Sequence, residues 1–288
     1  MNIKEGKFLE TILAEKKQEI AQMPDENSKP IRQTYRLYDY LKKHSDQLQV
    51  IAEVKKASPS LGDINLEVDI IAQAKNYEQA GAAMISVLTD PVFFKGNIEY
   101  LREISKNVQI PTLNKDFIID KKQINRALNA GATVILLIVA CFENDFEKLE
   151  ELYNYAISLG LEVLVETHNK AELDRAHQLA AKIIGVNNRN LKTFEVSLQN
   201  STDLVPYFKE ENVYISESGI FGKKEAQKVA ENFNGILVGT ALMQANNLTK
   251  SLTDENFNGI LVGTALMQAN NLTKSLTDLK IKRKNDEH

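Results

Sequence analysis

Residues 51–60 read Ile-Ala-Glu-Val-Lys-Lys-Ala-Ser-Pro-Ser, so an apolar run passes directly into charged residues. Successive side chains of a strand alternate between its two faces, which places Glu53 and Lys55 on the same side. A buried strand does not tolerate two charges, and Pro59 has no backbone N–H with which to continue a ladder. We therefore predict that a strand ends here and that a carboxylate and an ammonium leave it together, in an active site.

The same pattern of an apolar strand with a polar end recurs along the chain. The apolar runs begin near Val50, Met84, Ile110, Thr133, Glu162, Ile183, Val213 and Gly235. Amphipathic runs with helical spacing lie between them, over residues 69–80, 98–106, 121–130, 143–159, 170–180 and 223–230. Three of these helices are followed by a glycine, at Gly81, Gly131 and Gly160. Glycine is typical of helix C-termini, where the backbone adopts a left-handed conformation. The chain thus contains eight strand candidates separated by helices.

Strands joined by single helices pair in parallel through right-handed crossovers. Eight of them over about 200 residues predict an α/β fold, a closed (β/α)8 TIM barrel that forms one domain over residues 1–288. The alternative is an open, doubly wound sheet. The barrel is favoured because its active sites lie where the carboxyl ends of all strands converge. Polar residues follow nearly every predicted strand, namely Glu53, Lys55, Thr89, Asp90, Lys115, Glu166, Asn187, Arg189, Glu217 and Ser218.

Residues 1–48 form an N-terminal helical extension before the first strand. We predict helices over residues 7–22 and 34–43, with a proline-containing loop between them. The extension either closes the floor of the barrel or flanks its mouth, and the sequence leaves both possibilities open.

Residues 231–254 recur without a single change at 255–278. A solenoid has several divergent repeats, so one verbatim copy indicates a recent or engineered tandem duplication, or an artefact of sequence assembly. Each copy encodes the last strand-helix unit, and only one can close the barrel. We predict that the first copy does, because the other choice forces its apolar strand into a long excursion. Residues 260–267 then lack cover, which predicts partial disorder, an alternative register or aggregation.

Composition indicates an ordinary globular protein of 288 residues with a net charge of −4. We expect no general nucleic-acid binding, and we interpret the basic residues 280–284 as a solvated end. No run of about 18 uncharged apolar residues predicts a membrane span, and a charged start argues against a signal peptide. We expect a cytoplasmic protein that is a monomer or a weak oligomer. Cys141 is the single cysteine, so we predict a buried thiol and no disulfide or cysteine-based zinc site.

The polar strand ends carry chemistry that fits one cavity. Lys115 follows the third strand and Glu166 lies in the fifth, so an acid and a base face the barrel mouth. The alternative is a structural ion pair at the rim. Asn187 and Arg189 share a face after the sixth strand, where the Arg fork suits a carboxylate and the Asn amide suits a hydroxyl.

Glycines at the ends of the last two strands predict a phosphate site. Gly219 and Gly239 allow backbone N–H groups to approach a ligand closely. The loops after strands seven and eight are where barrels frequently bind phosphate. A tight turn at each glycine is the alternative.

Five motifs resemble, in order, those of the indole-3-glycerol-phosphate synthase family, and the resemblance covers nearly the whole chain. They are the stretch at 51–60, Lys-Asp-Phe-Ile at 115–118, Val-Glu-Thr-His at 165–168, Gly-Val-Asn-Asn-Arg-Asn-Leu at 185–191 and Ser-Glu-Ser-Gly-Ile at 216–220. The resemblance implies a (β/α)8 lyase of tryptophan biosynthesis that needs no metal or organic cofactor. Its reaction turns 1-(2-carboxyphenylamino)-1-deoxyribulose 5-phosphate into indole-3-glycerol phosphate, with loss of CO2 and water.

The resemblance also implies roles for single residues. Lys115 is expected to be the general acid for ring closure, Glu166 a base and Lys55 a second acid, with Glu53 assisting. The division of work among these four groups stays open. Supporting residues are Asn187 and Ser218, which hold sugar hydroxyls or orient the charges, and Glu217, which contributes to substrate binding.

Substrate contacts follow from the same resemblance. Arg189 is expected to receive the anthranilate carboxylate. The expected ring pocket consists of Pro59, Phe94, Phe117, Leu136 and Leu191, with Phe8 as a contact from the N-terminal segment. The expected phosphate site consists of Lys55, Ser58, Gly219, Gly239 and Thr240.

Two other functions remain in view. Another phosphosugar barrel, such as phosphoribosylanthranilate isomerase, shares the phosphate site, but two lysines and two glutamates at the mouth disfavour it. A catalytically impaired phosphate-binding barrel is the alternative if the duplication disrupts the fold. We interpret His168 and His177 as surface or structural residues, because neither has partners at zinc-site spacing.

Overall fold

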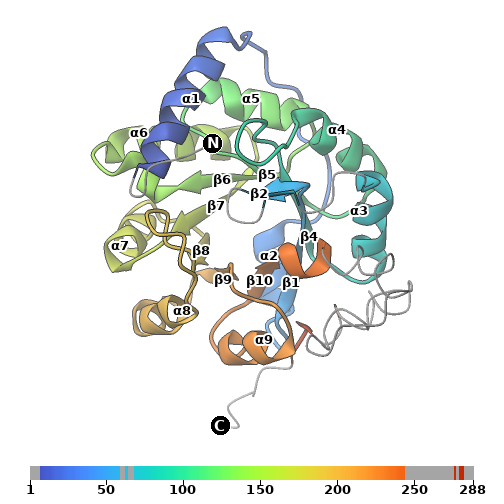
Figure 1. The fold of residues 1–288 in the computed structure, drawn as a ribbon, viewed down its shortest axis with the longest axis vertical. Helices are drawn as coiled ribbons and strands as arrows, with labels where there is room; N and C mark the ends of the chain where they lie inside the picture. Colours follow the sequence, from blue (N-terminus) through green and yellow to red (C-terminus); the bar gives the residue numbers. More distant parts are fainter. Residues whose placement is uncertain (1–6, 59–61, 64–67, 244–275, 277–278, 282–288) are drawn as a thin grey trace.

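The computed structural model describes residues 7–58, 62–63, 68–243, 276 and 279–281. Eight parallel strands in this part of the chain close into a barrel in the order β1-β10-β9-β8-β7-β6-β5-β4. Their bounds are β1 Gln49–Val54, β4 Met84–Leu88, β5 Thr112–Lys115, β6 Val134–Ile138, β7 Glu162–Thr167, β8 Ile183–Asn187, β9 Val213–Glu217 and β10 Gly235–Val238. The predicted (β/α)8 barrel is confirmed, and the open sheet is wrong (Figure 1).

Helices surround the barrel between consecutive strands (Figure 1). They are α3 Ile70–Gln79, α4 Ile98–Asn107, α5 Lys121–Asn129, α6 Phe146–Ser158, α7 Lys170–Gln178, α8 Gln199–Leu204 and α9 Lys223–Val229. Asp or Asn side chains accept first-turn backbone hydrogen bonds at Asp69, Asn97, Asp120, Asp145 and Asn169. The predicted C-cap glycines Gly81, Gly131 and Gly160 have φ of +87°, +94° and +85°. Local capping therefore sets where these helices begin and end.

The structure departs from the predicted elements at several places. Strand β5 begins at Thr112, later than predicted, because Pro111 has no backbone N–H to donate to the ladder. Between β8 and β9, the short α8 is followed by the 3-10 helix η2, Val205–Tyr207, in a connection for which we named no helical range. None of the helices in the described residues is long and apolar enough to cross a bilayer.

Alternation along the strands produces two apolar layers. Val50, Ala52 and Val54 of β1 pack outward with the helices, whereas Ile51 packs inside the barrel. The inner layer includes one residue from each of several strands, such as Leu113, Leu164, Ile215 and Leu237. The next inward position after each of these residues lies at the mouth. Strand periodicity thus decides which side chains reach the cavity.

The two helices of the N-terminal extension lie at opposite ends of the barrel. Helix α1, Phe8–Gln22, flanks the mouth, where its Lys16 pairs with Asp90 and Asp116 beyond the carboxyl ends of β4 and β5. Helix α2, Leu37–Lys43, lies at the floor, because its first backbone N–H groups donate to the Glu162 carboxylate at the start of β7. The sequence left two possibilities open for the extension. Helix α1 flanks the mouth, and helix α2 lies at the floor.

The first of the two identical copies closes the barrel, as predicted. Strand β10 comes from this copy, and its Gly235 pairs with Gln49 of β1 and with Ile215 of β9. The predicted uncovered segment 260–267 lies outside the described residues. Near the C-terminus, Leu276 and Leu279 are buried in the outer core layer.

Candidate active site

The inward-facing strand ends meet in one cavity at the barrel mouth. Four of the predicted charged residues, Glu53, Lys115, Glu166 and Glu217, stand two positions after the inner-layer apolar residues Ile51, Leu113, Leu164 and Ile215. The predicted residues that line the cavity are Phe8, Glu53, Lys55, Phe94, Lys115, Phe117, Leu136, Glu166, Asn187, Arg189, Leu191, Glu217, Ser218, Gly219, Gly239 and Thr240. Residues from all eight barrel strands or the segments after them thus gather at one place.

The side chain of Ser58 and the whole of Pro59 lie outside the described part of the structure, so their predicted places in the cavity stay predictions. Ser58 belongs to a small antiparallel ribbon of β2, Ala57–Ser58, and β3, Gly62–Asp63, which we did not predict.

Two ammonium groups and three carboxylates form the polar centre of the cavity. Lys115 Nζ donates to Glu217 Oε2 at 2.8 Å and lies 3.7 Å from Glu166 Oε2. Lys55 Nζ lies 2.8 Å from Glu53 Oε1. The three glutamate residues are only 1–3% exposed. Charges this deeply buried are retained only where partners compensate for their desolvation.

The three carboxylates differ in pKa, because burial and the neighbouring charges act on each of them to a different extent. Burial alone would raise the pKa of Glu53, but Lys55 and Lys115 outweigh burial and hold this pKa below its usual range. Burial is likewise outweighed at Glu166, whose pKa Lys115 and His168 lower to about 2. At Glu217 burial prevails over Lys115, and the pKa rises to about 7. Glu217 therefore has the highest pKa of the three carboxylates and is the one that titrates near neutral pH.

Two glycines make room for these carboxylates. A Cβ at Gly239 would lie 2.3 Å from Glu53 Oε1, and a Cβ at Gly185 would lie 2.1 Å from Glu217 Oε1. Neither distance is compatible with a side chain unless the carboxylate moves. Sequence analysis identified Gly239 for another reason and missed Gly185, whose only signal is a glycine inside an apolar strand.

Polar residues at the ends of β8 and β9, and directly after them, surround the buried charges. Asn187 Nδ2 donates to Glu166 Oε1 at 2.9 Å, and Asn187 Oδ1 accepts from the backbone N–H of Arg189 at 3.0 Å. Arg189 Nη1 donates to the Phe194 carbonyl at 3.2 Å, and burial lowers the pKa of this guanidinium. Ser218 has φ of +63°, a left-handed backbone that a non-glycine residue adopts at a cost and that occurs preferentially at functional sites.

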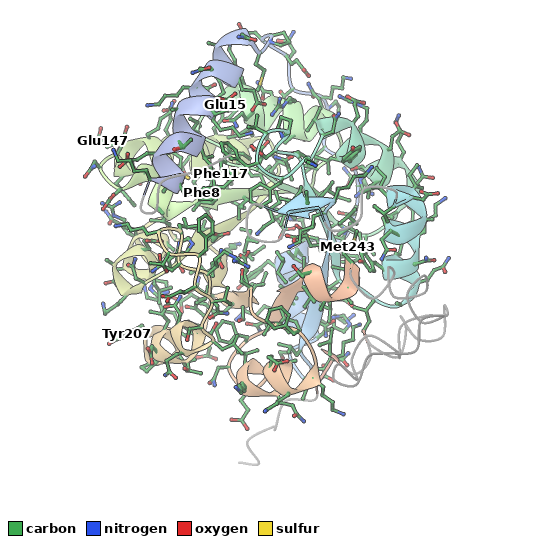
Figure 2. All side chains as sticks on the ribbon, viewed as in Figure 1. Phe8, Glu15, Phe117, Glu147, Tyr207 and Met243 are labelled. Carbon is green, nitrogen blue, oxygen red and sulfur yellow. The ribbon has the colours of Figure 1, made fainter. Side chains whose placement is uncertain are left out.

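An apolar pocket adjoins the charges. Phe94 and Phe117 have ring centroids 6.3 Å apart, and Phe8 of α1 packs against Phe194 at 4.6 Å. Phe8 and Phe117 line the same cavity although α1 and the β5 end are far apart in sequence (Figure 2). We missed Phe194, which precedes no recognisable motif, together with Leu88 and Ile138.

Gly219, Gly239 and Thr240 lie together at the other side of the cavity from the predicted ring pocket residues of β4 to β6. Gly219 has φ of +79°, and the Gly239 carbonyl accepts from the Met243 N–H at 2.9 Å, so a helical turn begins at this point. Backbone N–H groups at the beginning of a helical turn have no partner in the helix and suit an anion.

Of the two interpretations of His168, surface or structural, the structure excludes the surface one. Its Nε2 lies 3.2 Å from Glu166 Oε1, its Nδ1 lies 3.0 Å from Glu172 Oε2, and its side chain is 11% exposed. Although burial opposes protonation, the two carboxylates raise the pKa of His168 to about 10. His177 is the structural residue that we predicted, with Nε2 3.0 Å from the Tyr214 hydroxyl.

Replacing His168 with Gln is expected to change the pH profile. The substitution removes a cation beside Glu166, so the pKa of Glu166 rises and the acid limb of kcat/KM moves to higher pH by about one unit or more. His177→Gln is the matched control and should leave the limb in place. An acid limb that coincides in wild type and His168→Gln would show that His168 does not act on the ionisation of Glu166.

Sequence comparison finds known proteins that are similar to this chain over most of its length. A family model described as indole-3-glycerol phosphate synthase matches residues 9–254, a range that ends with the first identical copy. The indole-3-glycerol phosphate synthase of Lactococcus lactis subsp. cremoris (strain MG1363) is 92% identical over 288 residues, 100% of both chains. The synthase of Streptococcus pneumoniae (strain CGSP14) is 67% identical over 247 residues, 86% of this chain and 96% of its own.

Solved structures of other enzymes share the barrel. The tryptophan synthase alpha chain from Legionella pneumophila subsp. pneumophila has a TM-score of 0.57 at 14% identity, covering 84% of this chain and 96% of its own. The N-acetylmannosamine-6-phosphate 2-epimerase from Clostridium perfringens has a TM-score of 0.56 at 17% identity, covering 79% of this chain and 99% of its own. At such identities the likeness concerns the fold alone.

Proposed function

Because the chain belongs to the indole-3-glycerol phosphate synthase family, we propose that its barrel mouth converts 1-(2-carboxyphenylamino)-1-deoxyribulose 5-phosphate to indole-3-glycerol phosphate. One observation supports this most strongly. Two lysines and three glutamates share a buried cavity with an aromatic pocket. Ring closure and dehydration require proton transfers beside an aromatic ring, and this cavity offers both.

Ring closure is the step assigned to Lys115. A ring carbon of the anthranilate attacks the ribulose C2 carbonyl, the C=O π bond breaks, and the oxygen takes a proton from Lys115. The Glu217 carboxyl group, 2.8 Å from Lys115 Nζ and with a pKa of about 7, is placed to return a proton to the lysine. Loss of CO2 then gives the bond electrons back to the ring.

Dehydration is assigned to Lys55 and Glu166. Lys55 donates a proton to the leaving hydroxyl, which departs as water, while Glu166 removes one of the two protons from the neighbouring CH2 of the new five-membered ring, so that the indole becomes aromatic. A pKa of about 2 keeps Glu166 ionised for this work, and Asn187 holds one of its oxygens. Glu53 holds Lys55 in place through the 2.8 Å pair.

Binding is assigned to the walls of the cavity. Arg189 is the proposed partner of the anthranilate carboxylate, since its guanidinium lines the same cavity as Phe94 and Phe117. Gly219, Gly239 and Thr240 are the proposed phosphate site, with Lys55 and Ser58. Asn187 and Ser218 are proposed to hold sugar hydroxyls. An impaired barrel is less favoured, because within the described residues the first copy closes the barrel and supplies Gly239 and Thr240 to the cavity.

The proposal is tested by conversion of the purified substrate. The protein should release CO2 and form the fluorescent indole product in equal amounts, and a chelator should leave the rate unchanged. In the described residues, no group of three or more His, Cys, Asp or Glu side chains is arranged to hold a metal ion. Absence of the indole product at high enzyme concentration would overturn the proposed function.

A further inference from the structure

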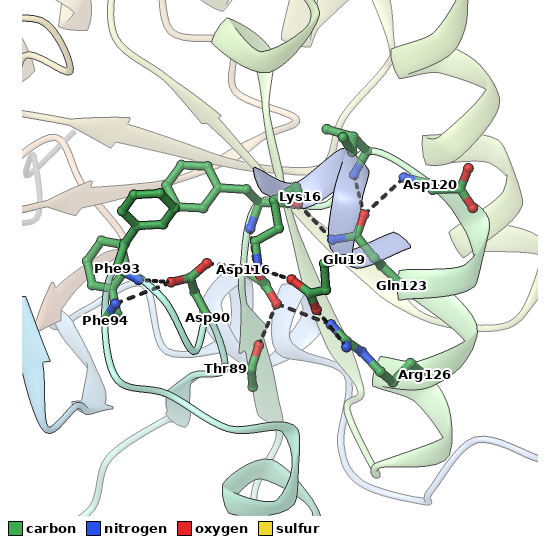
Figure 3. A network of polar contacts seen from close by, with 12 residues as sticks. Lys16, Glu19, Thr89, Asp90, Phe93, Phe94, Asp116, Asp120, Gln123 and Arg126 are labelled. Carbon is green, nitrogen blue, oxygen red and sulfur yellow. Dashed lines mark hydrogen bonds and ion pairs between the residues drawn. The ribbon is translucent and has the colours of Figure 1, made fainter. Parts of the chain in front are cut away.

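A second buried cluster of charges lies between the N-terminal helix and the barrel mouth (Figure 3). Lys16 of α1 is fully buried, and its Nζ lies 2.8 Å from Asp90 Oδ2 and 2.7 Å from Asp116 Oδ1. Glu19 Oε2 lies 2.8 Å from the same ammonium and Glu19 Oε1 accepts from Arg126 of α5 at 2.8 Å. The proposed reaction steps use none of these groups.

Both aspartates hold the backbone that carries the ring pocket. Asp90 Oδ1 accepts from the backbone N–H groups of Phe93 at 2.6 Å and Phe94 at 3.2 Å. Asp116 Oδ1 accepts from the Phe117 N–H at 2.8 Å, and Asp116 directly follows Lys115. The side chains that form the aromatic wall and the central ammonium therefore depend on where these two carboxylates lie.

The charge balance of the cluster depends on Lys16. Burial and Asp116 raise the pKa of Asp90, whereas Lys16 opposes this rise. Arg126 is the other cation and lies farther away, 3.6 Å from Asp116 Oδ2. Without Lys16, Asp90 and Asp116 would be two buried carboxylates that keep Arg126 as their remaining cationic partner among the ion pairs named here, and a carboxylate in that situation moves or takes up a proton.

The same helix carries part of the pocket wall. Phe8 lies two turns before Lys16 on α1, is 3% exposed, and packs edge-on against Phe93 with ring centroids 5.9 Å apart. Lys16 thus links three segments that are separate in sequence: α1, the loop after β4 and the loop after β5. A buried ion cluster is weak evidence for stability, because apolar side chains of the same volume often stabilise as well. Such a cluster can also hold the segments that carry its charged residues in fixed positions relative to one another.

We propose that Lys16 is a positioning residue that couples docking of α1 to formation of the pocket for the aromatic part of the substrate. The ammonium fixes Asp90 and Asp116, these fix Phe94 and Phe117, and the docked helix adds Phe8. Because coupling between two equilibria is reciprocal, a ligand in the ring pocket also stabilises the docked helix. The ring as ligand rests on the proposed function, whereas the coupling of α1 to the pocket does not.

Lys16→Met tests the proposal, with Lys17→Met on the exposed side of the same helix as matched control. Lys16→Met should raise KM at least about tenfold, within the range of ordinary coupling, and change kcat much less. Hydrogen exchange of residues 8–22 should become faster in Lys16→Met and stay unchanged in Lys17→Met. This exchange readout needs no turnover, so it answers even if the proposed reaction is wrong.

A second variant separates positioning from simple loss of folding. Lys16→Met combined with Asp90→Asn removes one charge of each sign and keeps the Oδ1 acceptor for Phe93 and Phe94. We expect this double variant to recover most of the loss in KM, including if Lys16→Met alone does not fold. A double variant with KM no better than Lys16→Met, or a Lys16→Met protein with wild-type KM and exchange, would overturn the proposal.

Discussion

Lys115→Ala is expected to lower the rate of indole-3-glycerol phosphate formation at least about 100-fold, the low end for loss of one general acid. The lysine is the centre of the cavity, because it pairs with Glu217 at 2.8 Å and with Glu166 at 3.7 Å, and burial is outweighed by these partners, which raise its pKa. Steady-state kinetics by indole fluorescence measure the loss, which should fall mainly on kcat.

Lys56→Ala is the matched control for this change. Lys56 follows the same strand end as Lys55, but its Nζ lies over the Tyr100 ring, 4.9 Å from the centroid. It does not line the cavity. The control should keep the wild-type rate, and circular dichroism should show that Lys115→Ala is folded. A folded Lys115→Ala protein with the wild-type rate would remove Lys115 from the mechanism.

Gly239→Asp is expected to lower kcat/KM on the order of 100-fold or more. Even a Cβ at this position would lie 2.3 Å from Glu53 Oε1, and a carboxylate would add a like charge beside Glu53 and beside the proposed phosphate site. Juxtaposed like charges cost several kcal/mol, and each 1.4 kcal/mol or so is a factor of about ten. Phosphate inhibition of turnover should weaken as well.

The second identical copy supplies a control for that variant. Gly263 occupies the same position in the second copy as Gly239 in the first, with identical neighbours. Because β10 comes from the first copy, Gly263→Asp should keep the wild-type kcat/KM. Equal tolerance of the two substitutions would mean that the second copy can replace the first in the barrel.

Strand periodicity made much of the fold and site predictable. Ile51 and Glu53, or Leu113 and Lys115, are two positions apart, so one packs inside the barrel and the other reaches its mouth. Such information is local, because it needs only the pleat of a single strand and the convergence of eight strand ends. The resemblance of the motifs then supplied the roles, which remain to be tested.

The features that sequence analysis missed depend on contacts between distant segments. Nothing near Lys16 indicates that a helix residue will lie between Asp90 and Asp116. Gly185 gives no local sign that its missing Cβ makes room for Glu217. His168 was set aside because it lacked metal-site spacing, although its partner Glu166 is only two residues away. An ion-pair partner was not considered there.

The central claim is that residues before the second copy form a complete catalytic mouth. The most direct test follows indole fluorescence from the purified substrate with the full chain and with a variant that lacks residues 255–278. Because the copies are identical, this deletion still leaves Leu-Thr-Asp directly before Leu279. The sequence around the two buried leucines, Leu276 and Leu279, is therefore unchanged. We predict the same product at the same rate from both proteins. Product from the full chain but not from the shortened one, or no product from either protein, would contradict the account.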